Sequence, residues 1–145
     1  PNEQLPAMAK ASKEELDFWK QLKADAGKAH ELILKNKPQR NADYVPSFDL
    51  AARMLEFAAD TALELRATAE AMQKKGFVGE QYARKFEALS ERQQKMWPEY
   101  RDIYAATNRP INLKYLCTAW QNSKKYLADF AADLRSGEAV KLISK

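Results

Sequence analysis

Residues 49–76 read DLAARMLEFAADTALELRATAEAMQKKG, and this stretch decides the fold class. Its core-type residues recur at spacings of three and four, the period that keeps side chains on one face of an α-helix. The members of this stripe are Leu50, Met54, Phe57, Thr61, Leu65, Thr68 and Met72. Asp49 is suited to cap free amides at the start, and two lysines followed by Gly76 are typical of a helix end. The stretch therefore predicts a helix over 49–75.

Similar patterns predict three further helices, over residues 12–36, 79–107 and 112–135. The first opens with Ser12-Lys-Glu-Glu15, a capping box in which each end residue bonds the backbone amide of the other. Residues between this helix and the next form the one sizeable loop of the prediction, because they include two prolines and two asparagines.

Prolines mark two places in the second half of the chain. The three-four spacing continues on both sides of Pro98, which predicts one bent helix, although a break with Pro98 opening a new helix is the alternative. Pro110 is expected to set the turn into the last helix. Gly137 is expected to end that helix, and the residues that follow to add one more turn.

Composition and length define the architecture. The chain has 145 residues, which fits one domain, and only four glycines and six prolines. Abundant Ala, Leu, Glu and Lys favour helices over sheets with tight turns. The short link GFVG at 76–79 makes the third helix double back against the second. We predict a single all-α domain over residues 1–145, an antiparallel four-helix bundle of up-down type with a kinked third helix, in which the second and third helices are closely paired.

Charges are mixed along the chain rather than gathered. Lys and Arg number 24 against 20 Asp and Glu, a net charge of +4, and acids alternate with bases as in EALSERQQK at 87–95. Nucleic-acid binders usually concentrate Lys and Arg on one face, so no nucleic-acid partner is expected. No run of about 18 apolar residues occurs, which predicts no membrane insertion. A basic-then-apolar signal pattern is also absent from the first residues.

Familiar catalytic and metal-binding patterns are absent from the sequence. His30, the one histidine, has Gly27 where the glutamate of a Glu-x-x-His metal pair would stand. Cys117, the one cysteine, excludes an internal disulfide and a cysteine-based zinc site, and is expected to be a small core side chain. No Gly-rich phosphate loop, Gly-x-Ser-x-Gly elbow or His-Glu-x-x-His occurs. We therefore predict no catalytic residue, no metal site, no cofactor, and a chain that is not an enzyme by itself.

Aromatic residues gather around the Trp97-Pro98 dipeptide and after the next predicted turn. Each tryptophan falls on or beside an apolar stripe, so packing inside the bundle is the favoured interpretation. If ring faces were exposed, they would suit a sugar ring, a nucleobase or a partner protein. The candidate ligand or partner surface consists of Trp97, Tyr100, Tyr104 and Trp120.

Two stretches carry a family resemblance, QRNADYVPSFDLAARMLEFA at 39–58 and MWPEYRDIYAATNRPINL at 96–113. The matching residues are Arg40, Asp43, Asp49, Leu50, Ala51 and Ala52 in the first, and Trp97, Asn108, Arg109, Pro110 and Leu113 in the second. Together they resemble the helical region that follows the catalytic barrel in family 20 glycoside hydrolases, the exo-β-N-acetylhexosaminidases. The likeness covers about residues 38–116. It departs from the family pattern at Pro98 and at Ile111-Asn112.

What the resemblance implies is an accessory role. The family's Asp-Glu catalytic pair lies on a barrel that a helical chain of this length cannot form. The resemblance thus implies a non-catalytic accessory domain that buttresses a catalytic domain of the same parent protein or mediates assembly, in a secreted or periplasmic enzyme. The alternatives are a free-standing protein-interaction module, which would be cytoplasmic, and a carbohydrate-binding module that uses exposed Trp and Tyr.

Overall fold

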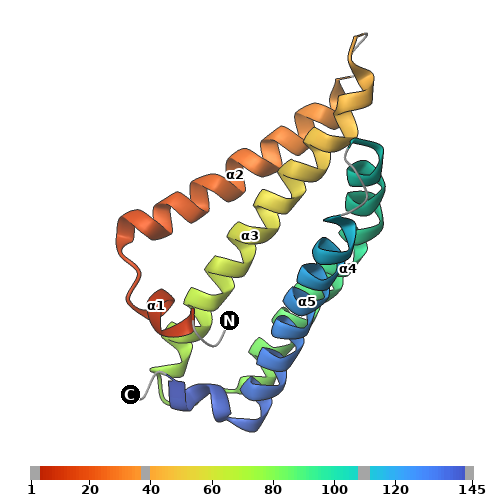
Figure 1. Cartoon of the computed structure of the whole chain (residues 1–145). Helices are drawn as coiled ribbons and strands as arrows, with labels where there is room; N and C mark the ends of the chain where they lie inside the picture. The colour runs from red at the N-terminus through yellow and green to blue at the C-terminus, as the bar shows by residue number, and fades with distance from the viewer. Residues whose placement is uncertain (1–3, 37–39, 108–111, 143–145) are drawn as a thin grey trace.

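The computed structural model describes residues 4–36, 40–107 and 112–142, and every regular element in them is helical, which confirms the all-α class. Figure 1 shows that each long helix returns along the one before it. The elements, in chain order, are α1 (Leu5–Ala9), α2 (Lys13–Lys35), the 3₁₀ helix η1 (Ala42–Tyr44), α3 (Val45–Met72), α4 (Gly79–Thr107), α5 (Leu113–Ser136) and the 3₁₀ helix η3 (Glu138–Leu142).

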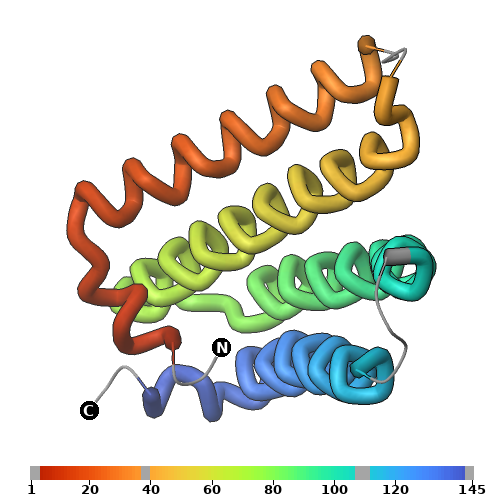
Figure 2. The backbone as a smooth tube through the Cα atoms, turned by 45° about the horizontal axis from the view of Figure 1, so that its top comes forward, coloured from red at the N-terminus to blue at the C-terminus, as the bar shows by residue number. Residues whose placement is uncertain are grey.

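Two helical hairpins make up the bundle. α2 packs along α3 and α5 packs along α4, whereas α3 and α4 contact each other less extensively. Figure 2 shows the four long helices following one another in the order α2, α3, α4, α5, with α2 and α5 at the two ends of the series. The prediction that the second and third helices form the close pair is therefore wrong. Long charged side chains bridge α3 and α4, as described below.

The observed bounds of α2, Lys13–Lys35, lie within one residue of the predicted helix over 12–36. The capping box is present, since the Glu15 amide donates to Ser12 Oγ at 3.2 Å and the Ser12 amide to Glu15 Oε2 at 2.7 Å. α4 continues without a break through Pro98, which excludes the alternative of a second helix starting there, while the bend itself stays a prediction. Gly137 follows α5 in the left-handed conformation, with φ of 79°, and η3 supplies the expected extra turn. Pro110 lies outside the described residues.

The start of α3 differs from the prediction. The helix begins at Val45, four residues before Asp49, so much of the expected loop is helical. Pro46 stands in the first turn, where its missing amide costs no helical hydrogen bond and its fixed φ suits the helix. Asp49 therefore does not cap the helix but lies one turn inside it. The other end comes at Met72, three residues early, and Gly76 takes its left-handed conformation, with φ of 85°, within the following turn.

The apolar core lies at one end of the molecule, the lower end in Figure 1. There Phe86 and Phe130 meet edge to face at 4.7 Å, both essentially without exposed surface. α1, which the sequence analysis missed, contributes the fully buried Leu5. The remaining buried residues of this cluster are Leu65, Ala69, Met72, Ala83, Leu89, Leu127, Ala131, Leu134 and Ala139. None comes from α2, and Ala26 is the one buried residue of that helix.

Candidate functional site

An open groove runs along α3 between α2 and α5. Two adjoining hollows form it, of about 520 Å³ on the α2 side and about 350 Å³ on the α5 side, and both are floored by Phe57 and Thr61. α1 closes one end. The groove is lined by Gln4, Ala7, Met8, Trp19, Phe57, Ala58, Thr61, Ala62, Leu65, Ala119, Asn122, Ser123, Tyr126 and Leu127.

The groove exists because α2 and α5 do not pack along each other. The predicted core stripe of α3 is buried at Leu50 and Leu65, but Phe57 and Thr61 between them are only half-buried. The apolar face of α3 is thus partly exposed at Phe57 and Thr61. Such exposure is unusual, because burial of apolar helix faces is the main source of stability in a bundle.

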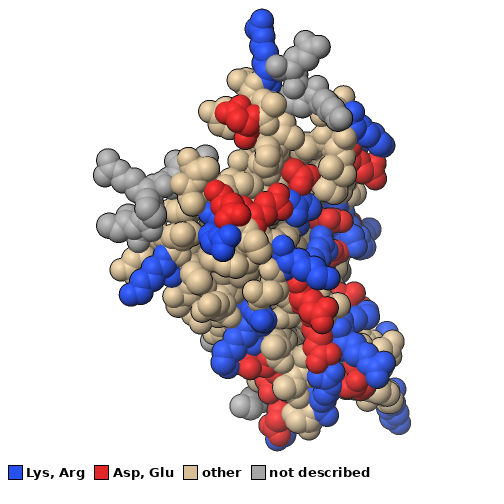
Figure 3. Space-filling model, turned by 90° about the vertical axis from the view of Figure 1, so that its right-hand side faces the viewer, with Lys and Arg blue, Asp and Glu red and all other residues tan. Residues whose placement is uncertain are grey.

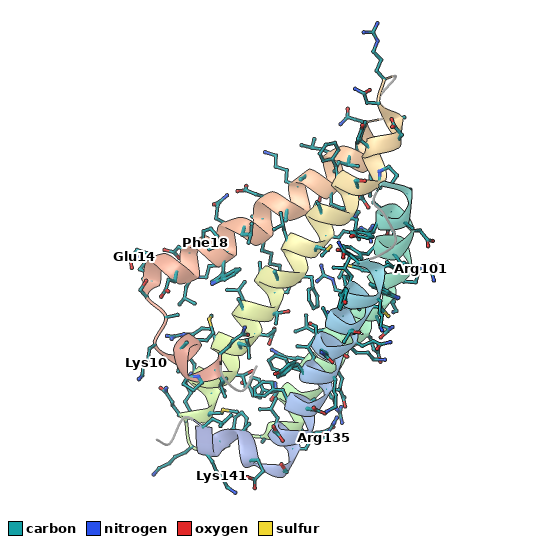
Figure 4. All side chains as sticks on the ribbon, in the orientation of Figure 1. Lys10, Glu14, Phe18, Arg101, Arg135 and Lys141 are labelled. Atoms are coloured by element: carbon teal, nitrogen blue, oxygen red, sulfur yellow. The ribbon has the colours of Figure 1, made fainter. Side chains whose placement is uncertain are left out.

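The lining carries no charged side chain, although 30% of the chain is Asp, Glu, Lys or Arg. Its polar members are neutral, and the Thr61 hydroxyl already donates to the Phe57 carbonyl at 2.9 Å. Large rings are part of the lining, and one of them, Tyr126 on α5, is 58% exposed. Trp19 on α2 meets the ring of Phe18 edge to face at 5.3 Å. Phe18 is also 58% exposed and is labelled on α2 in Figure 4. An occupant of this groove therefore gains mainly from apolar contact.

Another face of α3 is charged. We call the following set the ion-pair ladder: Asp49, Arg53, Glu56, Asp60 and Glu64 of α3, His30 and Lys23 of α2, and Lys85, Arg92 and Glu99 of α4. Arg92 contacts Asp60 and donates to Glu56 at 2.8 Å, and Lys85 donates to Glu64 at 2.8 Å. Ion pairs thus connect α3 to α4 from Arg53 to Glu64, in addition to the apolar core that the two helices share. Over the α4 and α5 side, Figure 3 shows basic and acidic residues interleaved.

Two cations of the ladder have shifted pKa values. The hydrogen bond from Lys23 to Asp60 raises the pKa of the lysine. Burial lowers the pKa of Arg53, but its hydrogen bonds to Glu99 and Asp49 outweigh that effect and raise it. Both cations therefore stay charged across the physiological range.

The four aromatic residues singled out in the sequence lie together where α4 and α5 meet. Tyr100 contacts Trp97, Tyr104 and Trp120, with ring centroids 6.0, 6.2 and 5.1 Å apart, and Trp97 lies 5.4 Å from Trp120. The Trp120 indole donates to the Gln93 carbonyl at 3.2 Å. The rings are half-buried and face one another, so their arrangement favours packing of α4 on α5. None of the four lines the groove.

Among residues 4–36, 40–107 and 112–142, no group of three or more His, Cys, Asp and Glu side chains could hold a metal ion. His30 instead lies 2.5 Å from Asp49, with Nδ1 toward Oδ1, and is about one-third exposed. Cys117 is only partly buried, so its assignment to the core is wrong. No helix in the described part of the chain is long and apolar enough to span a bilayer.

Comparisons with protein-family models, curated proteins and solved structures found no match to this chain. The resemblance to family 20 glycoside hydrolases therefore stays a prediction. Part of its basis, Asn108 to Pro110, falls outside the described residues.

The groove was missed in the sequence because its residues look like core. Phe57 and Thr61 follow the same spacing as the buried Leu65, and nothing in that spacing tells which turn of a helix lacks a neighbour. No local signal in the sequence marks this turn as uncovered.

Proposed function

We propose that this chain is a non-catalytic helical module that binds a partner protein by accepting an amphipathic helix in the groove. The observation that supports the proposal is the uncharged lining between α2 and α5 in an otherwise highly charged chain. A charged or strongly polar ligand would lose hydration there without gaining an ionic partner. An apolar helix face has no polar hydration to lose there, and it buries apolar surface against the lining.

The groove also indicates how the partner helix would be built. The floor extends from Phe57 to Leu65, eight residues further along the helix, which at 1.5 Å per residue is about 12 Å or two helical turns. Small floor residues at Ala58, Thr61 and Ala62 let a backbone approach, while the rings of Trp19 and Tyr126 stand at the sides. A helix of this length presents apolar residues at i, i+3, i+4 and i+7.

Selection from a random peptide library displayed on phage tests the proposal. Wild-type chain is the target, and the Ala58→Arg variant is used for counter-selection. Ala58 lines the groove and is exposed, so arginine is tolerated by the fold but places a charge in the groove. Ala88→Arg is the matched control, since Ala88 is equally an exposed helical alanine but lies on α4 and does not line the groove.

We expect the selected peptides to share the apolar spacing i, i+3, i+4, i+7 without charge on that face. They should bind the wild type and Ala88→Arg with similar affinity and bind Ala58→Arg at least tenfold more weakly. Peptides that bind all three proteins alike, or that are mainly charged, would refute the groove as the binding site.

A more specific form of the proposal is that the partner is the catalytic domain of a family 20-like glycoside hydrolase, with this chain as its accessory domain. The resemblance of residues 39–58 and 96–113 supports it. The reading frame of the gene tests it. A barrel-sized region with an Asp-Glu pair upstream of Pro1 would support this form, and a start codon immediately before Pro1 would refute it.

A further inference from the structure

One end of the groove is already filled by a helix of the same chain. α1 places Leu5 in the core without exposed surface, and Met8 and Ala9 pack against that core beside it. These three residues stand at i, i+3 and i+4, so α1 docks through the one-sided apolar pattern that we expect of a partner helix. Figures 1 and 2 show α1 lying across the lower end of α3, near the start of α2.

The apolar floor continues beneath α1. Leu65 lines the open groove and also belongs to the core cluster that surrounds Leu5, together with Ala69 and Met72 one and two turns further along α3. A partner helix that follows the groove toward the core would therefore meet α1 in its path.

A single side chain holds the other end of α1. Arg66 of α3 donates from Nη1 to the Met8 and Ala9 carbonyls, at 2.8 and 2.7 Å, while its Nε donates to Glu70 at 2.7 Å. The last carbonyls of a helix lack internal partners and carry partial negative charge, so a guanidinium is well suited to bind them. The core around Leu5 thus binds an apolar side chain, and Arg66 binds a helix C-terminus. Another helix can present both features.

We infer that α1 is a built-in competitor for the groove, and that a partner helix with the pattern Leu-x-x-Met-Ala displaces it. This inference rests on the proposed function and adds its regulation. α1 has five residues, too few to stay helical unless it is docked, so its release is a local event that leaves the hairpins in place. While α1 is docked, only the open part of the groove is accessible.

A labelled peptide of residues 1–12, PNEQLPAMAKAS, is the probe, and its binding to the full-length chain is followed by fluorescence anisotropy. In the wild type the tethered α1 competes at an effective concentration in the range of about a millimolar, because residues 10–12 form a short linker. Leu5→Ala weakens the tethered copy but leaves its site intact. The peptide should therefore bind the Leu5→Ala chain at least tenfold more tightly than the wild type. A peptide that itself carries Leu5→Ala should not bind.

Equal affinity for the two chains, or no binding to the Leu5→Ala chain, would overturn the inference. Far-UV circular dichroism checks that the Leu5→Ala chain is folded. If the Leu5→Ala chain does not fold, Met8→Ala, at a half-buried position of the same helix face, takes its place in the same binding measurement. The outcome is separate from that of the proposed function: library peptides that are sensitive to Ala58→Arg but indifferent to Leu5→Ala would leave the groove as the binding site and reduce α1 to a structural element.

Discussion

The contact between α4 and α5 at Gly79 leads to the sharpest prediction, for Gly79→Ala. A Cβ atom at Gly79 would lie 1.9 Å from the carbonyl oxygen of Leu134 and 2.7 Å from its carbonyl carbon. Even a close C–H···O contact needs about 3.3 Å, so one helix end must move by about 1.4 Å. Since the obstacle is backbone of α5 rather than a side chain that can rotate away, we expect a loss of about 3 kcal/mol in the free energy of unfolding, the upper end of the usual range for overpacking.

Urea and thermal unfolding, followed by far-UV circular dichroism, measure this effect. A loss of about 3 kcal/mol corresponds to a fall in Tm of roughly 6–12 °C for a chain of this size. Gly27→Ala is the matched control, because Gly27 lies inside α2 and the nearest atom to its added methyl group is Glu56 Oε1 at 3.8 Å. That variant should gain about 0.5–1 kcal/mol from helix propensity. If Gly79→Ala stayed within about 0.5 kcal/mol of the wild type, the close approach of α4 to α5 would be refuted.

Two further predictions concern polar groups on α4 and α5. Arg135, at the end of α5 (Figure 4), donates to Glu80 and to both oxygens of Glu87, and these hydrogen bonds lower the pKa of each carboxyl group. Their stabilisation is present above the ordinary value of 4.5 and is lost as the pH falls through the lowered pKa. Arg135→Gln should therefore be less stable than the wild type in urea at about pH 7, and the difference should shrink as the pH is lowered below 4.5; a difference that does not change with pH would contradict this. Gln93 is 6% exposed, and its Oε1 has no hydrogen-bond partner within the described residues. Gln93→Met should therefore raise the free energy of unfolding by about 1 kcal/mol, because it removes a buried oxygen without a partner. A destabilised variant would indicate that this oxygen is paired.

Much of the fold could be predicted from local signals. The capping box at Ser12, the left-handed glycine at Gly137 and the continuity of α4 through Pro98 depend on residues within about one turn of each other, and all three are present. α1 was missed because five residues give no helical periodicity, and its helix is stabilised by contacts of Leu5 and Arg66 that are distant in sequence. The early start of α3 was missed because the loop signals around Pro46 also suit a first helical turn.

The candidate site, too, could be predicted from the sequence only in part. The sequence predicted the aromatic residues Trp97, Tyr100, Tyr104 and Trp120 as a group, and they are close together in space. Their spacing did not reveal that the rings face one another. Conversely, Phe57 and Thr61 look like core residues in the sequence but floor the open groove.

The sequence by itself determined that this protein is built of long helices with mixed charge on their surfaces, because helix periodicity, caps and charge patterns are local properties. Only the tertiary structure decided which apolar faces are covered. The same three-four spacing leads to burial where α1, α3, α4 and α5 converge around Phe86, and to an open groove where α2 and α5 do not pack along each other. Periodicity defines the face of a helix that avoids water, but the packing of distant segments determines whether another helix covers it.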